Sequence, residues 1–394
     1  MSLKYILFFV STTLCLFGMS NFADVIGIHQ RTVLSFTLLL LYCLKYLNKK
    51  RFNYTFDKSY ILLLIIGFLI VAFQLVLGRN YFKSILSYCF LPCIISYFFE
   101  RLDLKQTNIL RKAVLLFYVT NCVMAIIERI TSTVYIGYNT FTDFEIVREE
   151  DWEFRSSALL GHPLANTIVM VPMLLCIMAS SMQWKNKMFC YFLGIIAMFC
   201  FNARSGILMA LICSVPAIVD NLKEQDKKER RRNIVLFSLC FVFAGYYIIN
   251  SDLSGRLFKL AEETGFLNDS SSLARLEILS FSDYLNTFDL LWGNPDSYNR
   301  LLITMNLVGI ENGIISILIY QGVILGIPLL CIMWYFNWKR FAEYKNTHRW
   351  MIFIGLYGIG LTNPHLQQGM VWIYILLCSF AFNPQYRNYK TQKI

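Results

Sequence analysis

Residues 59–77 read SYILLLIIGFLIVAFQLVL, an apolar run of nineteen residues without a charged side chain. A helix of about 20 predominantly apolar residues crosses the roughly 30 Å hydrocarbon core of a bilayer. Eleven further apolar runs, some with one or two charged residues, lie at 5–20, 32–47, 82–99, 113–130, 164–182, 185–201, 203–219, 233–250, 312–336, 349–362 and 369–383. The sequence therefore predicts an all-α polytopic membrane protein with about 12 transmembrane helices, in a single transmembrane domain over residues 1–394.

The composition agrees with this fold class. The chain is 57% hydrophobic and 15% charged, with a mean hydropathy of +0.51, which is too apolar for a soluble protein of 394 residues. The net charge of +11 comes from basic residues in short turns, most clearly KEQDKKERRR at 223–232. We interpret these clusters as topology signals and expect the lipid bilayer, and no nucleic acid, as the partner of this charge.

The charges also predict an orientation. With both termini inside, the cytoplasmic stretches hold 25 of the 36 Lys and Arg residues and 8 of the 25 acidic ones, which leaves 11 basic and 17 acidic residues outside. Cytoplasmic loops retain Lys and Arg, so this split favours cytoplasmic termini. The first apolar run follows a single basic residue, Lys4, and lacks a small-residue cleavage site, so we expect an uncleaved span.

Two long segments interrupt the alternation of spans and short turns, at 131–163 and 251–311. We expect both to be large, folded extracytoplasmic loops, the second with an amphipathic helix over 273–279 and a turn at 292–296. The run 185–219 is interrupted at 202–206. As one helix it would be about 50 Å long at ~1.5 Å per residue, so we predict two crossings joined by a turn at Arg204.

Cysteine usage and motifs indicate neither a metal nor a cofactor. All twelve cysteines lie in apolar runs, without Cys-x-x-Cys or Cys/His spacing, and are expected to pack as small apolar residues. The chain has no phosphate-binding GxxxxGK[ST] loop, so ATP is not expected to drive its reaction.

Several polar residues recur at the predicted outer membrane surface. Any single arginine there is explained by snorkelling or by pairing with an acid. As a set, Arg155, Arg204 and Arg275 are expected to line one cavity and to bind a diphosphate, because guanidinium groups form bidentate hydrogen bonds to phosphate oxygens. Arg79 and Lys83 are weaker candidates for the same role. A lipid-linked diphosphate carries its charge at this depth.

Two further residues are candidates for acid–base chemistry. His162 precedes Pro163 at the start of a predicted span, and it is either a helix cap or a base. Glu311 precedes the apolar run 312–336, where it is either an acid that stabilises the helix N-terminus or a general base. The sequence leaves both alternatives open.

In this order, the motifs resemble those of the O-antigen polymerase and O-antigen ligase superfamily. The similarity includes an Arg followed by Gly-His-Pro before a span (Arg155, Gly161–Pro163), an Arg-Ser-Gly turn (Arg204–Gly206), an Arg-containing helix in the largest external loop (Arg275), and a polar residue plus Asn opening the next span (Glu311, Asn312). Ligases of this superfamily have His where this chain has Glu311. The resemblance is therefore closer to the polymerases.

The resemblance implies a GT-C-type, inverting, metal-independent glycosyltransferase of the bacterial inner membrane. Its donor and acceptor would be undecaprenyl-diphosphate-linked glycans on the periplasmic face, which it would polymerise into O-antigen or a related surface polysaccharide, with a chain-length regulator protein as a further partner. Arg155, Arg204 and Arg275 would bind the diphosphate. The alternatives are an O-antigen ligase, which transfers glycan to lipid A-core, and a flippase for lipid-linked oligosaccharides. A flippase is expected to carry its charges along a central cavity and to have short external loops.

Overall fold

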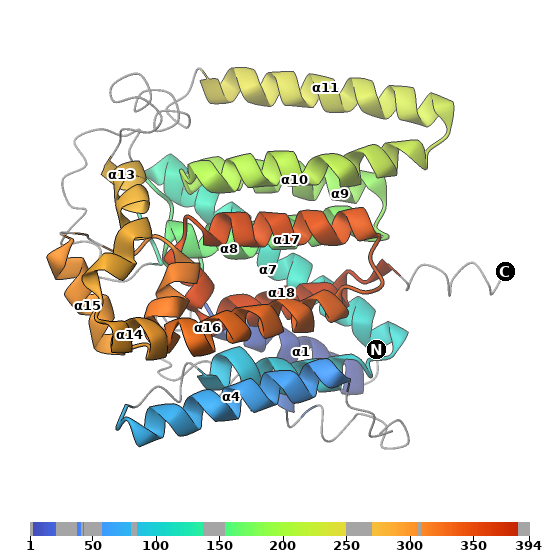
Figure 1. Ribbon diagram of the computed structural model, residues 1–394. Coiled ribbons are helices and arrows are strands. Elements are labelled where there is room, and N and C mark those ends of the chain that lie inside the picture. The colour runs from blue at the N-terminus through green and yellow to red at the C-terminus, as the bar shows by residue number, and fades with distance from the viewer. Residues whose placement is uncertain are drawn as a thin grey trace.

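The computed structural model describes residues 3–20, 38–40, 42, 57–79, 85–136, 154–249, 270–305, 307 and 309–384. Every regular element in these ranges is a helix (Figure 1). The longer helices are α1 (Leu3–Gly18), α4 (Lys58–Val76), α6 (Leu91–Phe99), α7 (Leu104–Thr131), α8 (Pro163–Ala179), α9 (Trp184–Cys200), α10 (Arg204–Lys223), α11 (Lys227–Ile249), α16 (Gly313–Arg340), α17 (Asn346–Gly360) and α18 (Gly369–Ala381). The shorter ones are η2 (Leu86–Phe90), α13 (Ser270–Glu277), η6 (Ile278–Tyr284), α14 (Thr287–Trp292), α15 (Pro295–Thr304) and η7 (Pro364–Gln367).

The predicted apolar runs correspond to helices wherever the structure describes them. The run 32–47 lies largely outside the described residues, and the described part of each of the other eleven is mainly helical. Four of these helices, α4, α7, α10 and α16, are long and apolar enough to cross a membrane, and α1, α8 and α18 are apolar but shorter. The all-α architecture is thus seen in the described residues and is compatible with a membrane protein, whereas the number of crossings stays a prediction.

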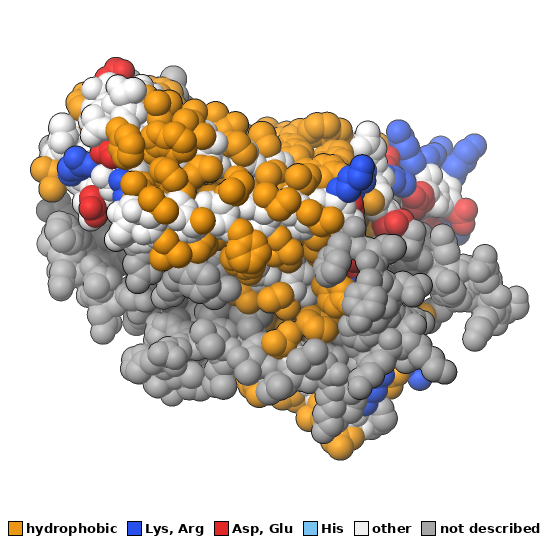
Figure 2. All heavy atoms as spheres, turned by 60° about the horizontal axis from the view of Figure 1, so that its bottom comes forward, with side chains coloured by type: hydrophobic (Ala, Val, Ile, Leu, Met, Phe, Trp, Pro, Cys, Tyr) orange, Lys and Arg blue, Asp and Glu red, His pale blue; other side chains and the backbone are white. Residues whose placement is uncertain are grey.

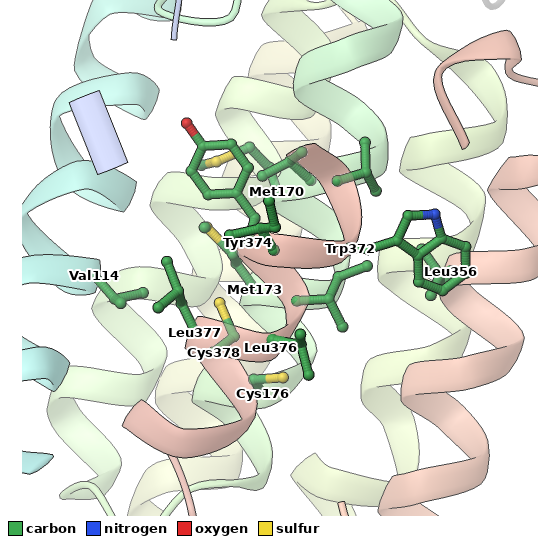
Figure 3. Close-up of a cluster of buried hydrophobic side chains, with 14 of the residues drawn as sticks. Val114, Met170, Met173, Cys176, Leu356, Trp372, Tyr374, Leu376, Leu377 and Cys378 are labelled. Carbon is green, nitrogen blue, oxygen red and sulfur yellow. The ribbon is translucent and has the colours of Figure 1, made fainter. Parts of the chain in front are cut away.

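The centre of the bundle is formed by α8 and α18. All seventeen residues of α8 are buried, and so are all residues of α18 except Met370. The two helices pack against each other, and α7, α9, α10 and α17 surround them. Figure 3 shows Cys176 of α8 near Leu376 and Cys378 of α18, and Met170 of α8 near Tyr374 of α18. Because lipid tails are as apolar as these side chains, close packing holds such helices together in a membrane.

Most cysteines pack in this core, as expected for small apolar residues. The buried ones are Cys15, Cys89, Cys93, Cys122, Cys176, Cys190, Cys200, Cys213 and Cys378, whereas Cys240 and Cys331 are exposed.

The outer surface carries the apolar belt of a membrane protein. Figure 2 shows a broad band of hydrophobic side chains, bounded at two opposite ends by Lys, Arg, Asp and Glu. On α4, large apolar side chains such as Ile65, Phe68 and Leu69 are more than half exposed. Exposed apolar area of this extent marks a surface that faces another apolar phase, here the lipid.

Helices α13, α14 and α15 lie together at one end of the bundle, opposite the marked N-terminus (Figure 1). The turn between α14 and α15 rests on a break in α16. Gly293 and Gly322 both have positive φ, 76° and 71°, and a Cβ on either would lie 2.3 Å from a backbone atom of the other segment. Asn294 N–H donates to Ile319 O at 3.0 Å across the same contact. Glycine is required at both positions because the backbone of the α14–α15 turn touches the backbone of α16 and leaves no space for a Cβ.

These elements also bear on the local predictions. The run 185–219 is divided where expected, because α9 ends at Cys200 and α10 begins at Arg204. The helix expected over 273–279 begins earlier, as α13, and continues from Ile278 as a 3-10 helix. The turn expected at 292–296 is the α14–α15 junction. Of the loop predicted at 131–163, residues 137–153 lie outside the described residues.

Candidate functional site

Three of the predicted arginines line one cavity although they are far apart in the sequence. Arg155 precedes α8, Arg204 is the first residue of α10, and Arg275 lies on α13. The full lining of this cavity, called the arginine pocket below, is Arg155, Leu164, Asn202, Ala203, Arg204, Ser205, Arg275 and Glu311. Its free volume is about 30 Å³, enough for roughly one or two water molecules. The predicted general base, Glu311, is therefore a neighbour of the arginines.

Glu311 is paired with one of them. Its Oε2 lies 2.6 Å from Arg275 Nη2, and both side chains are partly exposed. Asn312, the next residue, caps α16: its Oδ1 accepts hydrogen bonds from the N–H groups of Ile314 and Ile315 at 3.1 and 3.0 Å. The cap fixes where α16 begins and so fixes the position of Glu311.

The segment that carries Arg155 is held by a buried carboxylate near the end of α7. Glu128 is fully buried, and its Oε2 accepts hydrogen bonds from the N–H groups of Ser157 and Ala158 at 2.7 and 2.8 Å. Its Oε1 accepts from Tyr135 N–H at 3.1 Å. Four backbone N–H groups in all donate to this carboxylate. These N–H groups lie outside regular helices, so the carboxylate supplies the acceptors that a helix would otherwise provide. Glu128 therefore positions the segment that contains Arg155.

Further contacts fix the same segment against the end of α9. Ser156 Oγ donates to Ala125 O at 2.7 Å, and Ser156 N–H donates to Cys200 O at 3.0 Å. Arg155 Nε in turn donates to Phe201 O at 3.3 Å. Arg155 is thus joined to the α9–α10 turn, which carries Arg204.

The position of Arg204 follows from the tight turn before it. Asn202 has φ 52°, the left-handed conformation that allows α9 to end and α10 to begin within three residues. Gly206, in the first turn of α10, lies against α8, where an added Cβ would be 2.1 Å from the Thr167 methyl carbon. The Arg-Ser-Gly sequence thus places an arginine at the helix start and permits close approach to α8.

His162 is the cap of α8, which was one of its two sequence-based interpretations. Its Nδ1 accepts a hydrogen bond from Leu164 N–H at 3.1 Å, and Pro163 follows as the first helical residue. His365 Nε2 lies 3.0 Å from the same Nδ1. Since Nδ1 of His162 accepts from Leu164, it carries no proton, so the His162 proton is on Nε2 and His365 Nε2 is a donor.

The surroundings of both histidines favour the neutral ring. Burial, the neighbouring His365 and the charge of Arg155 lower the pKa of His162 well below its usual value. Burial lowers the pKa of His365 to about 4. A neutral His162 that is protonated at Nε2 is a hydrogen-bond donor. The general-base role of His162 is therefore not favoured in this arrangement.

Asn363 attaches the turn between α17 and α18 to this group. Its Nδ2 donates to Leu164 O at 2.7 Å, and its Oδ1 accepts from His365 N–H at 2.9 Å. The starts of α8, α10 and α16 and the α17–α18 turn thus meet at one place.

Two weaker candidates lie elsewhere. Arg79 is not among the residues that line the arginine pocket. Its guanidinium donates to Gly293 O, and its Nη2 lies 4.0 Å from the buried carboxylate of Asp289. Arg79 thus connects the end of α4 to the α14–α15 turn. It lies away from the arginine pocket because residues at the same membrane depth can differ in lateral position. Lys83 lies outside the described residues.

Sequence reasoning missed Glu128 and His365. Glu128 lies inside the apolar run 113–130, where a charged acid is costly unless it has hydrogen-bond or ion-pair partners. Its presence in that run is therefore a sequence signal for a buried, partnered carboxylate. His365 follows Asn363-Pro364 in a short turn and has no distinctive spacing. Within the described ranges, no three His, Cys, Asp or Glu side chains gather closely enough to hold a metal ion.

No protein-family model and no curated protein matches this sequence, so the resemblance to a polymerase and ligase superfamily rests on the motifs of the chain alone.

Proposed function

We propose that this protein is a membrane-embedded glycosyltransferase that polymerises undecaprenyl-diphosphate-linked repeat units into O-antigen or a related surface polysaccharide. The observation that carries the proposal is the arginine pocket, in which Arg155, Arg204 and Arg275 come from three separate segments. Three guanidinium groups at the end of an apolar helix bundle suit a diphosphate whose lipid tail lies in the bilayer. The motif order described above supports the same family.

The chemistry follows from these groups. The acceptor sugar hydroxyl attacks the anomeric carbon of the donor, and the bond from that carbon to the diphosphate oxygen breaks. The diphosphate leaves with the electron pair, and the arginines stabilise its charge. The hydroxyl proton passes to the Glu311 carboxylate, which acts as general base. Attack opposite the leaving group inverts the anomeric configuration.

Two alternatives make different products. A ligase would transfer the glycan to lipid A-core, and a flippase would move the lipid-linked unit across the membrane without lengthening it. Glu311 stands where ligases of the superfamily have His, which favours the polymerase. The arginines meet at one end of the bundle rather than along its centre, where α8 and α18 are packed with apolar side chains, which favours an enzyme over a flippase.

The test is reconstitution of the purified protein in liposomes with a defined lipid-linked repeat unit. We expect a ladder of products that grow by whole repeats, and loss of the ladder in Arg204→Ala. The matched control is Arg232→Ala, which removes an exposed arginine that pairs only with Glu229 among the described residues and should leave the ladder intact. Transfer of single units to added lipid A-core would indicate the ligase, and translocation without lengthening would indicate the flippase.

A further inference from the structure

The arginine pocket already contains an anion of the protein itself. Three guanidinium groups and one carboxylate line it, and that carboxylate, Glu311, lies 2.6 Å from Arg275 Nη2. A contact of this length between a guanidinium and a carboxylate is a charge-assisted hydrogen bond, about twice as strong as a neutral one. Any other anion that binds Arg275 at Nη2 therefore competes with Glu311.

The small free volume of the pocket also indicates that a second anion competes with Glu311. A free volume of about 30 Å³ holds roughly one or two water molecules, whereas ligand pockets measure about 300–1,000 Å³. This space is small for a diphosphate, and movement of a lining side chain would enlarge it. Glu311 and Arg275, which are in direct contact, are both partly exposed, with side-chain exposures of 30% and 25%, and Arg155 and Arg204 are partly exposed as well.

Arg275 also has a donor that Glu311 does not satisfy. Its Nε is buried and has no hydrogen-bond partner among the described residues. Nε and Nη2 form one edge of the guanidinium fork, and a phosphoryl group with two oxygens can accept from both. The contact from Glu311 to Nη2 leaves the buried Nε of Arg275 without a hydrogen-bond acceptor among the described residues, which is unfavourable. A bidentate oxyanion on this edge would satisfy both donors.

We propose that Glu311 is a displaceable internal anion: the diphosphate of the donor replaces it on the Nε–Nη2 edge of Arg275. The displaced carboxylate then no longer pairs with Arg275 and can accept the acceptor's proton. The general base is thereby uncovered only when a donor is bound. This inference rests on the proposed function, because it takes the arginine pocket as the diphosphate site.

Pyrophosphate binding to the purified full-length protein in nanodiscs, measured by calorimetry, tests the proposal. Glu311→Gln removes the competing charge and keeps the side-chain shape, so it should tighten pyrophosphate binding about five- to tenfold. The matched control is Glu277→Gln, which removes an exposed carboxylate on the same helix as Arg275 and should change binding less than twofold.

A second pair of variants tests whether the gain in pyrophosphate binding depends on Arg275. In an Arg275→Ala background, Glu311→Gln should give no gain, because the competition takes place at Arg275. Unchanged binding in Glu311→Gln, or a gain that persists without Arg275, would overturn the proposal while leaving the diphosphate site intact. Absence of pyrophosphate binding in every variant, with normal elution on size-exclusion chromatography, would overturn the diphosphate site itself and this proposal with it.

Discussion

His365 Nε2 lies 3.0 Å from His162 Nδ1, although the two residues are 203 positions apart in the chain. The contact joins the α17–α18 turn to the start of α8, next to the segment that carries Arg155. Because Leu164 N–H also donates to His162 Nδ1, two donors converge on one ring nitrogen. Protonation of His162 at Nδ1 would break both hydrogen bonds.

The histidine pair predicts a pH dependence of stability. The pKa of His365 is lowered to about 4 and that of His162 also lies below its usual value, whereas both are near 6.5 in an unfolded chain. At pH values well above about 6.5, both histidines are neutral in the folded and in the unfolded chain, so the free energy of unfolding does not depend on their protonation. As the pH falls from 6.5 towards 4, the unfolded chain binds protons that the folded chain does not, so stability is lost.

The measurement is the thermal unfolding midpoint between pH 7.5 and pH 4.5. The wild-type protein should lose more stability over this range than His365→Gln or His162→Gln, each of which removes one titrating ring. Since every other ionisable group is shared, the difference between the curves reports the pair. Parallel curves would show that the two rings titrate normally.

Glu128 is predicted to be essential for the local structure around Arg155. Glu128→Gln places an amide N–H group opposite backbone donors that now face a carboxylate oxygen, which should destabilise the protein by about 2 kcal/mol. Polymer formation should fall as well, because the Ser156–Ala158 segment is released. Unfolding in denaturant checks the stability, and Asp283→Asn, at an exposed carboxylate on η6, is the control. Equal stability of the two variants would contradict this role.

The charge split of the sequence predicts the topology. Reporters inserted at position 265 or after α15 should be extracytoplasmic, and a reporter between α10 and α11 should be cytoplasmic, because basic residues gather on the latter side. Alkaline phosphatase and green fluorescent protein fusions provide the readout. A cytoplasmic signal from position 265 would reverse the orientation and place the arginine pocket on the wrong face for the proposed substrate.

Glu311→Gln is predicted to abolish chain growth even though it tightens diphosphate binding. The amide does not accept the proton of the acceptor hydroxyl, and a general base contributes about 10²–10⁴-fold to the rate. Cells that carry this variant should display single repeats without polymer at normal protein levels. Normal chain length at normal expression would remove Glu311 from catalysis, and its pairing with Arg275 would then be structural.

Particular residues show how far the sequence predicts this molecule. The sequence predicts the break at Asn202–Arg204, because one uninterrupted helix would be too long for a bilayer. It also predicts the shared pocket of Arg155, Arg204 and Arg275, because all three lie at the same expected membrane depth. The position of Arg79 was not, because depth says nothing of lateral position. The role of Glu128 depends on a segment 30 residues later in the chain folding back onto it, a contact that no local pattern encodes.

Donor saturation of Arg204 variants tests the central claim most directly, that the clustered arginines bind the diphosphate of a lipid-linked glycan. In the reconstituted assay, Arg204→Ala should raise the KM for the lipid-linked donor by about tenfold or more, and Arg204→Lys should restore it only in part, because Lys lacks the planar fork that matches two phosphate oxygens. Arg232→Ala should retain the wild-type KM. A donor KM that is unchanged in Arg204→Ala, with a ladder of normal length, would contradict the account.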